Sequence, residues 1–175
     1  LDLLPSEKAA AIKDIALKIS EGEFADQFPV EVFQSGSATS TNMNMNEVIA
    51  NLGSNDNIEI HPNDDVNLGQ SSNDVIPSAL SISVAIYLHE HMIPAAVHLE
   101  KIINDKASTL TSVVKMGRTH LQDAMPITMA QEMGGWSASI RDSILQFENA
   151  LEKIQELAIG GTAVGTGVNT HPDVG

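Results

Sequence analysis

The segment DVIPSALSISVAIYL (Asp74–Leu88) does most to set the fold class of this chain. Its apolar residues cover most of the circumference of a helix; they are Val75, Ile76, Ala79, Leu80, Ile82, Val84, Ala85 and Ile86. A helix that is apolar on several sides needs neighbours on several sides. We therefore predict a mainly all-α chain, a bundle of long helices with small irregular or extended segments, which other chains complete.

Start signals and prolines define the helical region around this segment. Ser72-Asn73 is a good helix start, so we expect helix over about Asp74–Leu110. Pro77 falls in the first turn, where proline is tolerated, and Pro94 is expected to kink or split the run.

Three further helices are expected. Leu4–Glu21 has apolar residues at helical spacing, and Thr128 opens a last long helix that reaches Ile159. Asn42–Leu52 is expected to form a short helix, with Asn44 and Glu47 spaced as in a capping box. The segments between the helices are predicted as irregular (22–40), loop (53–69), extended (113–125) and a glycine-rich turn (160–167).

Composition narrows the classes of protein to which the chain can belong. Aromatic residues make up 3% of its 175 residues, so aliphatic side chains, alanine and methionine must fill the core. The net charge of -14 argues against a nucleic-acid partner and against an anionic membrane surface. The chain has no cysteine, which excludes disulfide bonds and thiol chemistry.

Neither a membrane span nor a signal peptide is expected. The longest apolar stretch, around Val75–Leu88, is interrupted by proline and serine and is too short to cross a bilayer. The start, LDLLPSEKAA, has no basic region followed by an apolar one, and it has no initiator methionine. We expect this chain to be a piece of a longer one, without a membrane partner.

Three runs are dense in neutral hydrogen-bond donors. They are GSATSTNMNMNE (Gly36–Glu47), HPNDDVNLGQSSND (His61–Asp74) and GRTHLQDAMPIT (Gly117–Thr128). Each lies beside an expected helix, and a helix N-terminus with hydroxyl and amide side chains suits a small anion. The third run adds His120, the type of side chain that most readily moves a proton near neutral pH.

Each run also has a simpler interpretation. Ser71-Ser72-Asn73 and the serines and threonines of the first run can act only as helix caps. His61-Pro62-Asn63-Asp64 can be an Asx-type turn fixed by the proline, and His120 can be structural.

Two further patterns carry little functional weight. His89, His91 and His98 invite a metal site, but His89 and His91 point to different helix faces and no third ligand is apparent. The run GGTAVGTG lacks a following GK[ST] and the GxGxxG spacing, so a tight turn is the better interpretation than a phosphate loop.

Together the runs resemble one family closely. The chain looks like a class II, metal-independent fumarate hydratase of the fumarase/aspartase superfamily. The resemblance rests on SGSATSTNMNMNEVIANL, HPNDDVN, QSSNDVIPSAL, GRTHLQDAMPITMAQE and LAIGGTAVGTGVNTHP, which occur in family order over about residues 27–175. GRTH, HPND and NTHP favour fumarase over aspartase, which usually carries GRTQ, NPND and NTP.

The resemblance implies a fold, a reaction and an assembly. The family fold is a long-helix bundle in a homotetramer, whose active sites each draw on three subunits. On that pattern, residues 1–70 are the end of an N-terminal region with active-site loops, and residues 71–175 are the first part of the central helical domain. The implied reaction is the reversible anti addition of water to fumarate, giving L-malate, without a metal or other cofactor.

The resemblance also implies roles for residues of this chain. His120 becomes the catalytic acid-base group. The implied substrate contacts are Ser37, Thr39, Asn42, Ser71, Ser72, Asn73 and Thr119, and the implied second anion site consists of His61, Asn63 and Asp64. The expected location is the cytoplasm, or the mitochondrial matrix if the source is a eukaryote.

Two departures from the family pattern matter. Leu68-Gly69 stands where the family often has Lys-Ser, which removes a local positive charge. The 175 residues contain no GSSxMPxKxNP loop, which in the family supplies the base that removes the carbon-bound proton. We therefore expect the longer parent to be active and these residues alone to be inactive. Two alternatives are an aspartate ammonia-lyase on the same scaffold and a helical assembly fragment without catalysis.

Overall fold

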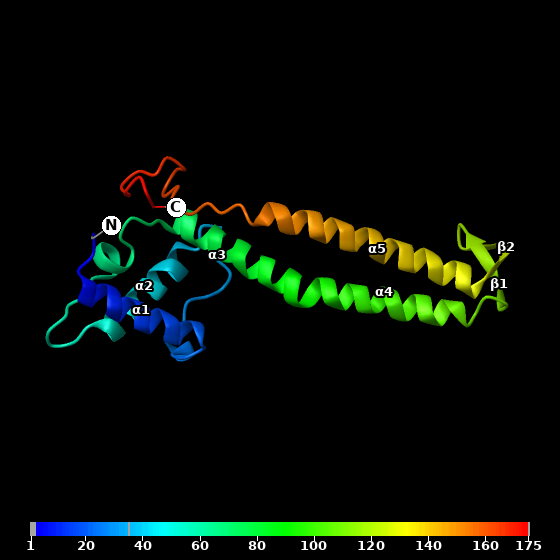
Figure 1. Ribbon diagram of the computed structural model, residues 1–175, viewed down its shortest axis with the longest axis horizontal. Coiled ribbons are helices and arrows are strands. Elements are labelled where there is room, and N and C mark those ends of the chain that lie inside the picture. Colours follow the sequence, from blue (N-terminus) through cyan, green and yellow to red (C-terminus); the bar gives the residue numbers. More distant parts are fainter. Residues whose placement is uncertain (1–2, 35, 175) are drawn as a thin grey trace. The chain divides into compact units, whose positions relative to one another are not determined.

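A computed structural model describes residues 3–34 and 36–174 of the chain (Figure 1). The chain divides into two compact units, one formed by residues 1–80 and 157–175 and the other by residues 81–156. Helices predominate in both units, which confirms the predicted mainly all-α fold. The predicted division into residues 1–70 and 71–175 stays a prediction.

The first unit is built on two packed helices. Helix α1 (Ser6–Ser20) and helix α2 (Thr39–Gly53) bury Ile15, Ile49 and Ala50 against each other. Ile60 and Val66, from the segment after α2, complete this cluster. The same unit contains the 3-10 turn η1 (Ala25–Gln27), the π-helical turn η2 (Pro62–Val66) and the start of helix α3 (Ser72–Tyr87).

The predicted start of α2 was wrong by three residues. The helix begins at Thr39 after Ala38, whose backbone is left-handed at φ 43° and which offers no side-chain cap. Asn44 therefore lies inside the helix, and its amide nitrogen donates to the carbonyl of Gln27 at 3.0 Å. The capping box predicted for Asn44 and Glu47 does not form. The predicted loop 53–69 likewise contains the turn η2.

Helix α3 continues through a π-helical turn, η3 (Leu88–Met92), into helix α4 (Ile93–Ser108). Pro94 lies in the first turn of α4, and the predicted interruption of the run takes the form of a π-helical turn within a continuous helix. The helix departs from α geometry here because Pro94 has no N–H to donate to the preceding turn. Pro77 lies in the second turn of α3, one turn later than predicted.

The combined helix α3–η3–α4 is longer than the apolar stretch that the sequence suggested. It runs from Ser72 to Ser108, 37 residues, with a mean hydropathy of 1.2 in its most apolar window. By length and composition alone, a helix of this kind could cross a membrane. The core helix of a soluble protein passes the same test, so this property is weak evidence for a membrane span.

The second unit is a helical pair joined by a β-hairpin. Helices α4 and α5 (Met129–Ile154) run side by side (Figure 1). Arg141 on α5 binds Glu100 on α4, with Nη2 at 2.7 Å from Oε1. Thr128 caps α5 because its hydroxyl oxygen accepts the N–H of Gln131, and Oε1 of Gln131 accepts the N–H of Thr128. The predicted last helix is thus confirmed, although it ends at Ile154, before the predicted Ile159.

Strands β1 (Val114–Thr119) and β2 (Gln122–Thr128) form an antiparallel pair. The extended segment predicted from the sequence is therefore a hairpin. Its register shifts between Met116 and Arg118, where the single residue Gly117 faces an extra residue of β2. A side chain at Gly117 would place Cβ 2.8 Å from the carbonyl oxygen of Met125, so the close approach requires glycine.

Candidate active site

A chain of hydroxyl groups joins the first two polar runs at the start of α3. The Ser37 hydroxyl lies 3.2 Å from the Thr39 hydroxyl, which lies 3.1 Å from the Ser72 hydroxyl. Thr39 begins α2 and Ser72 begins α3, so the two helix starts meet at this point. Three predicted substrate contacts, distant in sequence, are thus brought together within the first unit. We call Ser37, Thr39 and Ser72 the hydroxyl cluster.

Ser71 caps α3, as the simpler interpretation of this run predicted. Its carbonyl accepts the N–H of Val75 at 3.0 Å, and its hydroxyl oxygen accepts the N–H of Asn73 at 3.2 Å. The cap uses an acceptor of the Ser71 hydroxyl and leaves its hydrogen to donate. The amide of Asn73 donates to the carbonyl of Ala163 at 2.9 Å. The cap and an anion-binding role are compatible here.

Asn42 is placed differently from the hydroxyl cluster. It is 5% exposed and lies one turn into α2. Its Nδ2 donates to Oδ1 of Asn67 at 3.1 Å, and Nδ2 of Asn46 donates to the same oxygen at 3.0 Å. Asn67 therefore ties α2 to the segment before α3, and Asn42 is part of this buried amide network.

The HPND run leads into the turn η2, which the side chains of His61 and Asp65 stabilise in different ways. Nδ1 of His61 accepts the N–H of Asp64 at 3.1 Å, so the imidazole is the cap of this turn. Oδ2 of Asp65 accepts the N–H of His61 at 2.8 Å and the ammonium of Lys8 at 2.6 Å. These two bonds hold the pKa of Asp65 below its ordinary value. The turn is π-helical and is not an Asx turn, because the imidazole provides the cap.

The exposed side chains of this turn are those predicted for a second anion site. Asn63 and Asp64 are exposed, and the His61 side chain is half exposed. Asp64 brings a negative charge, with Oδ2 at 3.3 Å from Nδ1 of His61. The second site stays a prediction.

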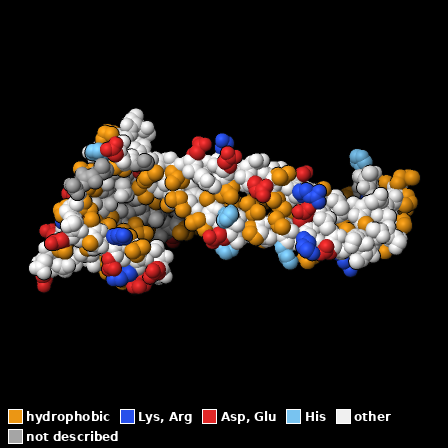
Figure 2. Space-filling model, in the orientation of Figure 1, with side chains coloured by type: hydrophobic (Ala, Val, Ile, Leu, Met, Phe, Trp, Pro, Cys, Tyr) orange, Lys and Arg blue, Asp and Glu red, His pale blue; other side chains and the backbone are white. Residues whose placement is uncertain are grey.

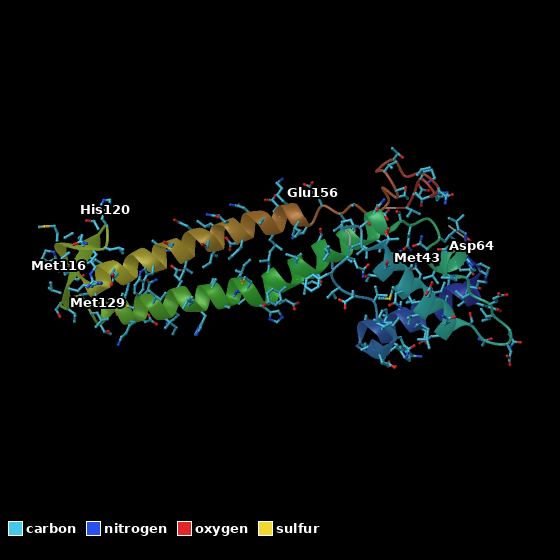
Figure 3. All side chains as sticks on the ribbon, turned by 180° about the vertical axis from the view of Figure 1, so that it is seen from behind. Met43, Asp64, Met116, His120, Met129 and Glu156 are labelled. Atoms are coloured by element: carbon cyan, nitrogen blue, oxygen red, sulfur yellow. The ribbon has the colours of Figure 1, made fainter. Side chains whose placement is uncertain are left out.

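His120 lies at the tip of the hairpin in the second unit (Figure 3). His120 and Leu121 form its two-residue turn, with φ of 51° and 61°. Two consecutive positive φ values are typical of a type I′ turn, which matches the twist of the flanking strands. Thr119 precedes the turn, and both Thr119 and His120 are exposed. Thr119 and His120 thus belong to the second unit, whereas the hydroxyl cluster belongs to the first.

Sequence reasoning missed Asp74, a buried carboxylate of the first unit that joins two distant segments. Asp74 is 1% exposed, and both of its carboxylate oxygens accept backbone N–H groups. An acidic residue in the first turn of a helix is common, so nothing in the sequence distinguished it. Its partner Thr162 lies 88 positions away in the glycine-rich run, which the sequence predicted only as a turn.

Gly69 gives the departure at Leu68-Gly69 a structural reason. Its φ is +69°, and a Cβ there would lie 2.8 Å from the hydroxyl of Thr170. A side chain at this position would be strained and would crowd the end of the chain against the loop before α3. Glycine at position 69 therefore suits both the backbone conformation and the close approach of Thr170.

The structure suggests no metal site among the residues it describes. Residues 3–34 and 36–174 contain no group of three or more His, Asp or Glu side chains placed to hold a metal ion. Of the three histidines His89, His91 and His98, His91 packs its ring against Tyr87, with ring centroids 5.3 Å apart.

Comparison with known proteins places the chain in a family. The sequence model of a family described as lyase matches residues 1–175. The chain belongs to this lyase family. It is 51% identical to a class II fumarate hydratase from Xylella fastidiosa over 100% of its own length. It is 48% identical to the class II fumarate hydratase of Photorhabdus laumondii over 99% of its length.

Two solved structures are similar to this chain in both fold and sequence. A recombinant class II fumarase from Schistosoma mansoni has a TM-score of 0.89 and 37% identity over 98% of this chain. A Brucella melitensis protein described as fumarate lyase:delta crystallin, solved with cobalt, has a TM-score of 0.85 and 40% identity over 97%. The chain spans 37% to 39% of the length of these four relatives.

Proposed function

We propose that the full-length protein containing this chain is a fumarate hydratase that adds water reversibly to fumarate, giving L-malate. The observation that carries the proposal is the hydroxyl cluster at the start of α3. It joins two polar runs through Thr39 and Ser72, which lie 33 positions apart, in a chain about half identical to class II fumarate hydratases. Such an arrangement of neutral donors suits one carboxylate of a small dicarboxylate.

The chemistry needs stabilisation of negative charge and one movable proton. Removal of the proton next to a carboxylate of malate places a second charge on that carboxylate. Donors fixed in advance stabilise this charge, and each donor lost costs about 2–4 kcal/mol if it behaves as an oxyanion-hole group. Ser71, Ser72 and Asn73, together with Ser37 and Thr39, are the donors that we assign to the dicarboxylate.

His120 is our assignment for the group on the water side of the reaction. In the direction of hydration the imidazole takes a proton from water, and in reverse it protonates the departing hydroxyl. Thr119, next to it on β1, is assigned to substrate binding. Both side chains are exposed at the tip of a hairpin, where they are free to meet a second surface.

We also propose that the protein is a homotetramer with active sites shared between subunits. The exposed apolar residues of the second unit support this; they are Ile82, Val84, Ile86, Met92, Val97, Leu99, Ile102, Trp136 and Leu145. Hydrophobic side chains extend along the helices on the face shown in Figure 2. A contiguous apolar surface of this kind marks an interface with a protein or a membrane. Packing against other subunits would cover it and would explain the membrane-like hydropathy of the combined helix.

A mixing experiment tests the shared site. Ser72→Ala and His120→Asn variants of the full-length protein are expected to be nearly inactive alone. If each site takes Ser72 from one subunit and His120 from another, random hybrid tetramers regain about one quarter of the intact sites. Activity should return after the variants are unfolded and refolded together. If the mixture stays inactive although hybrids form, Ser72 and His120 act within one chain and the shared site is wrong.

A further inference from the structure

We propose that Asp74 is a positioning residue, whose buried carboxylate locks the glycine-rich run 160–167 onto the start of α3 and thereby fixes the donors of Ser71–Asn73. The contacts come from the structure, and only the activity readout depends on the proposed function.

The carboxylate joins two segments through two separate oxygens. Oδ1 accepts the N–H of Ser71 at 3.0 Å, and Oδ2 accepts the N–H of Thr162 at 2.8 Å. The amide of Asn73 adds a third link, to the carbonyl of Ala163 at 2.9 Å. All of these residues belong to the first unit. Asp74, the residue after the predicted donors, and Asn73, one of those donors, are thus both bonded to the run 160–167.

Burial makes the Asp74 contacts costly to lose. Asp74 is 1% exposed and Thr162 is 5% exposed, so water cannot replace a missing partner easily. The backbone of Thr162 is left-handed, with φ of 55°, which a β-branched residue rarely adopts. A strained residue persists only where its surroundings hold it, and the bond to Asp74 is such a constraint.

A carboxylate is the only common side chain of this size that suits both partners. Both are N–H donors, so both side-chain oxygens must accept. An asparagine at position 74 would turn its NH2 group toward one of the two N–H groups in either orientation. Asp74→Asn therefore breaks one link while it preserves size and shape.

The contact with Thr162 uses the backbone, which provides a matched control. Thr162→Gly keeps the N–H, removes the side chain and permits the positive φ without strain. Asp14→Asn, at an exposed carboxylate paired with Lys18 on α1, controls for loss of one negative charge. Both controls are expected to keep the lock.

The experiment compares these variants in the full-length protein. For Asp74→Asn we expect an assembled enzyme whose kcat/KM for fumarate is about 10- to 100-fold lower, because small displacements of binding groups have effects of this size. Hydrogen exchange should accelerate by at least about 10-fold at the amide of Ser71 or at that of Thr162, whichever loses its acceptor. Thr162→Gly and Asp14→Asn should stay within about 3-fold of the unmodified protein in kcat/KM.

Three results would overturn the proposal. The first is an Asp74→Asn enzyme that is less stable but has unchanged kcat/KM, since that describes a purely structural residue. The second is unchanged exchange at Ser71 and Thr162. The third is a loss of kcat/KM in Thr162→Gly as large as that in Asp74→Asn.

Succinate, an unreactive dicarboxylate, provides a second test in the unmodified protein if Asp74→Asn does not assemble. A lock between the two segments requires that succinate slow exchange in both Ser71–Asn73 and residues 160–167, because coupling is reciprocal. Slowing confined to Ser71–Asn73 contradicts the lock. If succinate changes exchange in neither segment, dicarboxylate binding itself has failed. The lock is then tested by comparing exchange at Ser71 and Thr162 in Asp74→Ser with that in the unmodified protein, and equal exchange contradicts it.

Discussion

Replacement of Lys115 tests what holds the hairpin that carries His120. The Lys115 ammonium on β1 lies 2.6 Å and 2.7 Å from the two carboxylate oxygens of Glu132 on α5. Their side chains are 33% and 28% exposed, so this ion pair lies between a surface pair and a buried one. Surface pairs contribute about 0–1 kcal/mol, and breaking a buried pair costs about 3–5 kcal/mol. We therefore expect Lys115→Met to destabilise the hairpin by about 1–2 kcal/mol.

Hydrogen exchange of the hairpin amides measures this effect directly. A loss of 1–2 kcal/mol raises the open population of residues 114–128 by about 5- to 30-fold, and exchange should accelerate by the same factor. Glu132→Gln should have a similar effect, and the double variant should be little worse than either single one. The control is Lys101→Met, which breaks an exposed pair with Asp105 in the same unit.

The control pair is 69% and 60% exposed, so its loss should change exchange by less than about 3-fold. The reasoning is refuted if Lys115→Met changes exchange of the hairpin by less than 2-fold, about the limit of a negligible effect. It is also refuted if the two single variants add fully in the double variant, because the residues would then not interact.

Two further predictions concern the first unit. The pKa of Asp65 is lower in the folded chain than in the unfolded chain. The Asp65 carboxylate therefore stabilises the fold fully at pH values above its unfolded pKa near 4, and this stabilisation is lost as the pH falls through its folded pKa. In urea unfolding, the free energy of unfolding should fall less between about pH 5 and pH 2 in Asp65→Asn than in the unmodified protein. Gly69→Ala should lower the free energy of unfolding by about 1 kcal/mol or more, because alanine disfavours φ of +69°. Gly134→Ala, at a helical glycine with open space around Cβ, should be neutral or stabilising in the same urea titration.

The sequence predicted the long helices because their signals are local. Apolar spacing and the Thr128 cap belong to single segments, and both were confirmed in the structure. The start of α2 was wrong because Ala38 gives no local sign of its left-handed backbone. The hairpin turn was missed because His120 and Leu121 lack the Asn-Gly signature of a type I′ turn.

The candidate site was predictable in its residues and much less so in its contacts. Side-chain type and motif predict Ser37, Thr39 and Ser72 as substrate contacts, and the structure brings these three residues together. The role of Asn42 within a buried amide network depends on Asn67, which no periodicity identifies. Asp74 was missed for the same reason, because its partner Thr162 is distant in sequence.

The most direct test of the proposed function is turnover of fumarate by the full-length protein. Loss of fumarate absorbance, with malate measured as product, is compared with ammonia release from aspartate under the same conditions. The proposal predicts fumarate hydration, no deamination of aspartate, and loss of hydration in His120→Asn while the assembly stays intact; the 175-residue chain alone should be inactive. Deamination of aspartate, or full hydration activity in His120→Asn, would contradict it.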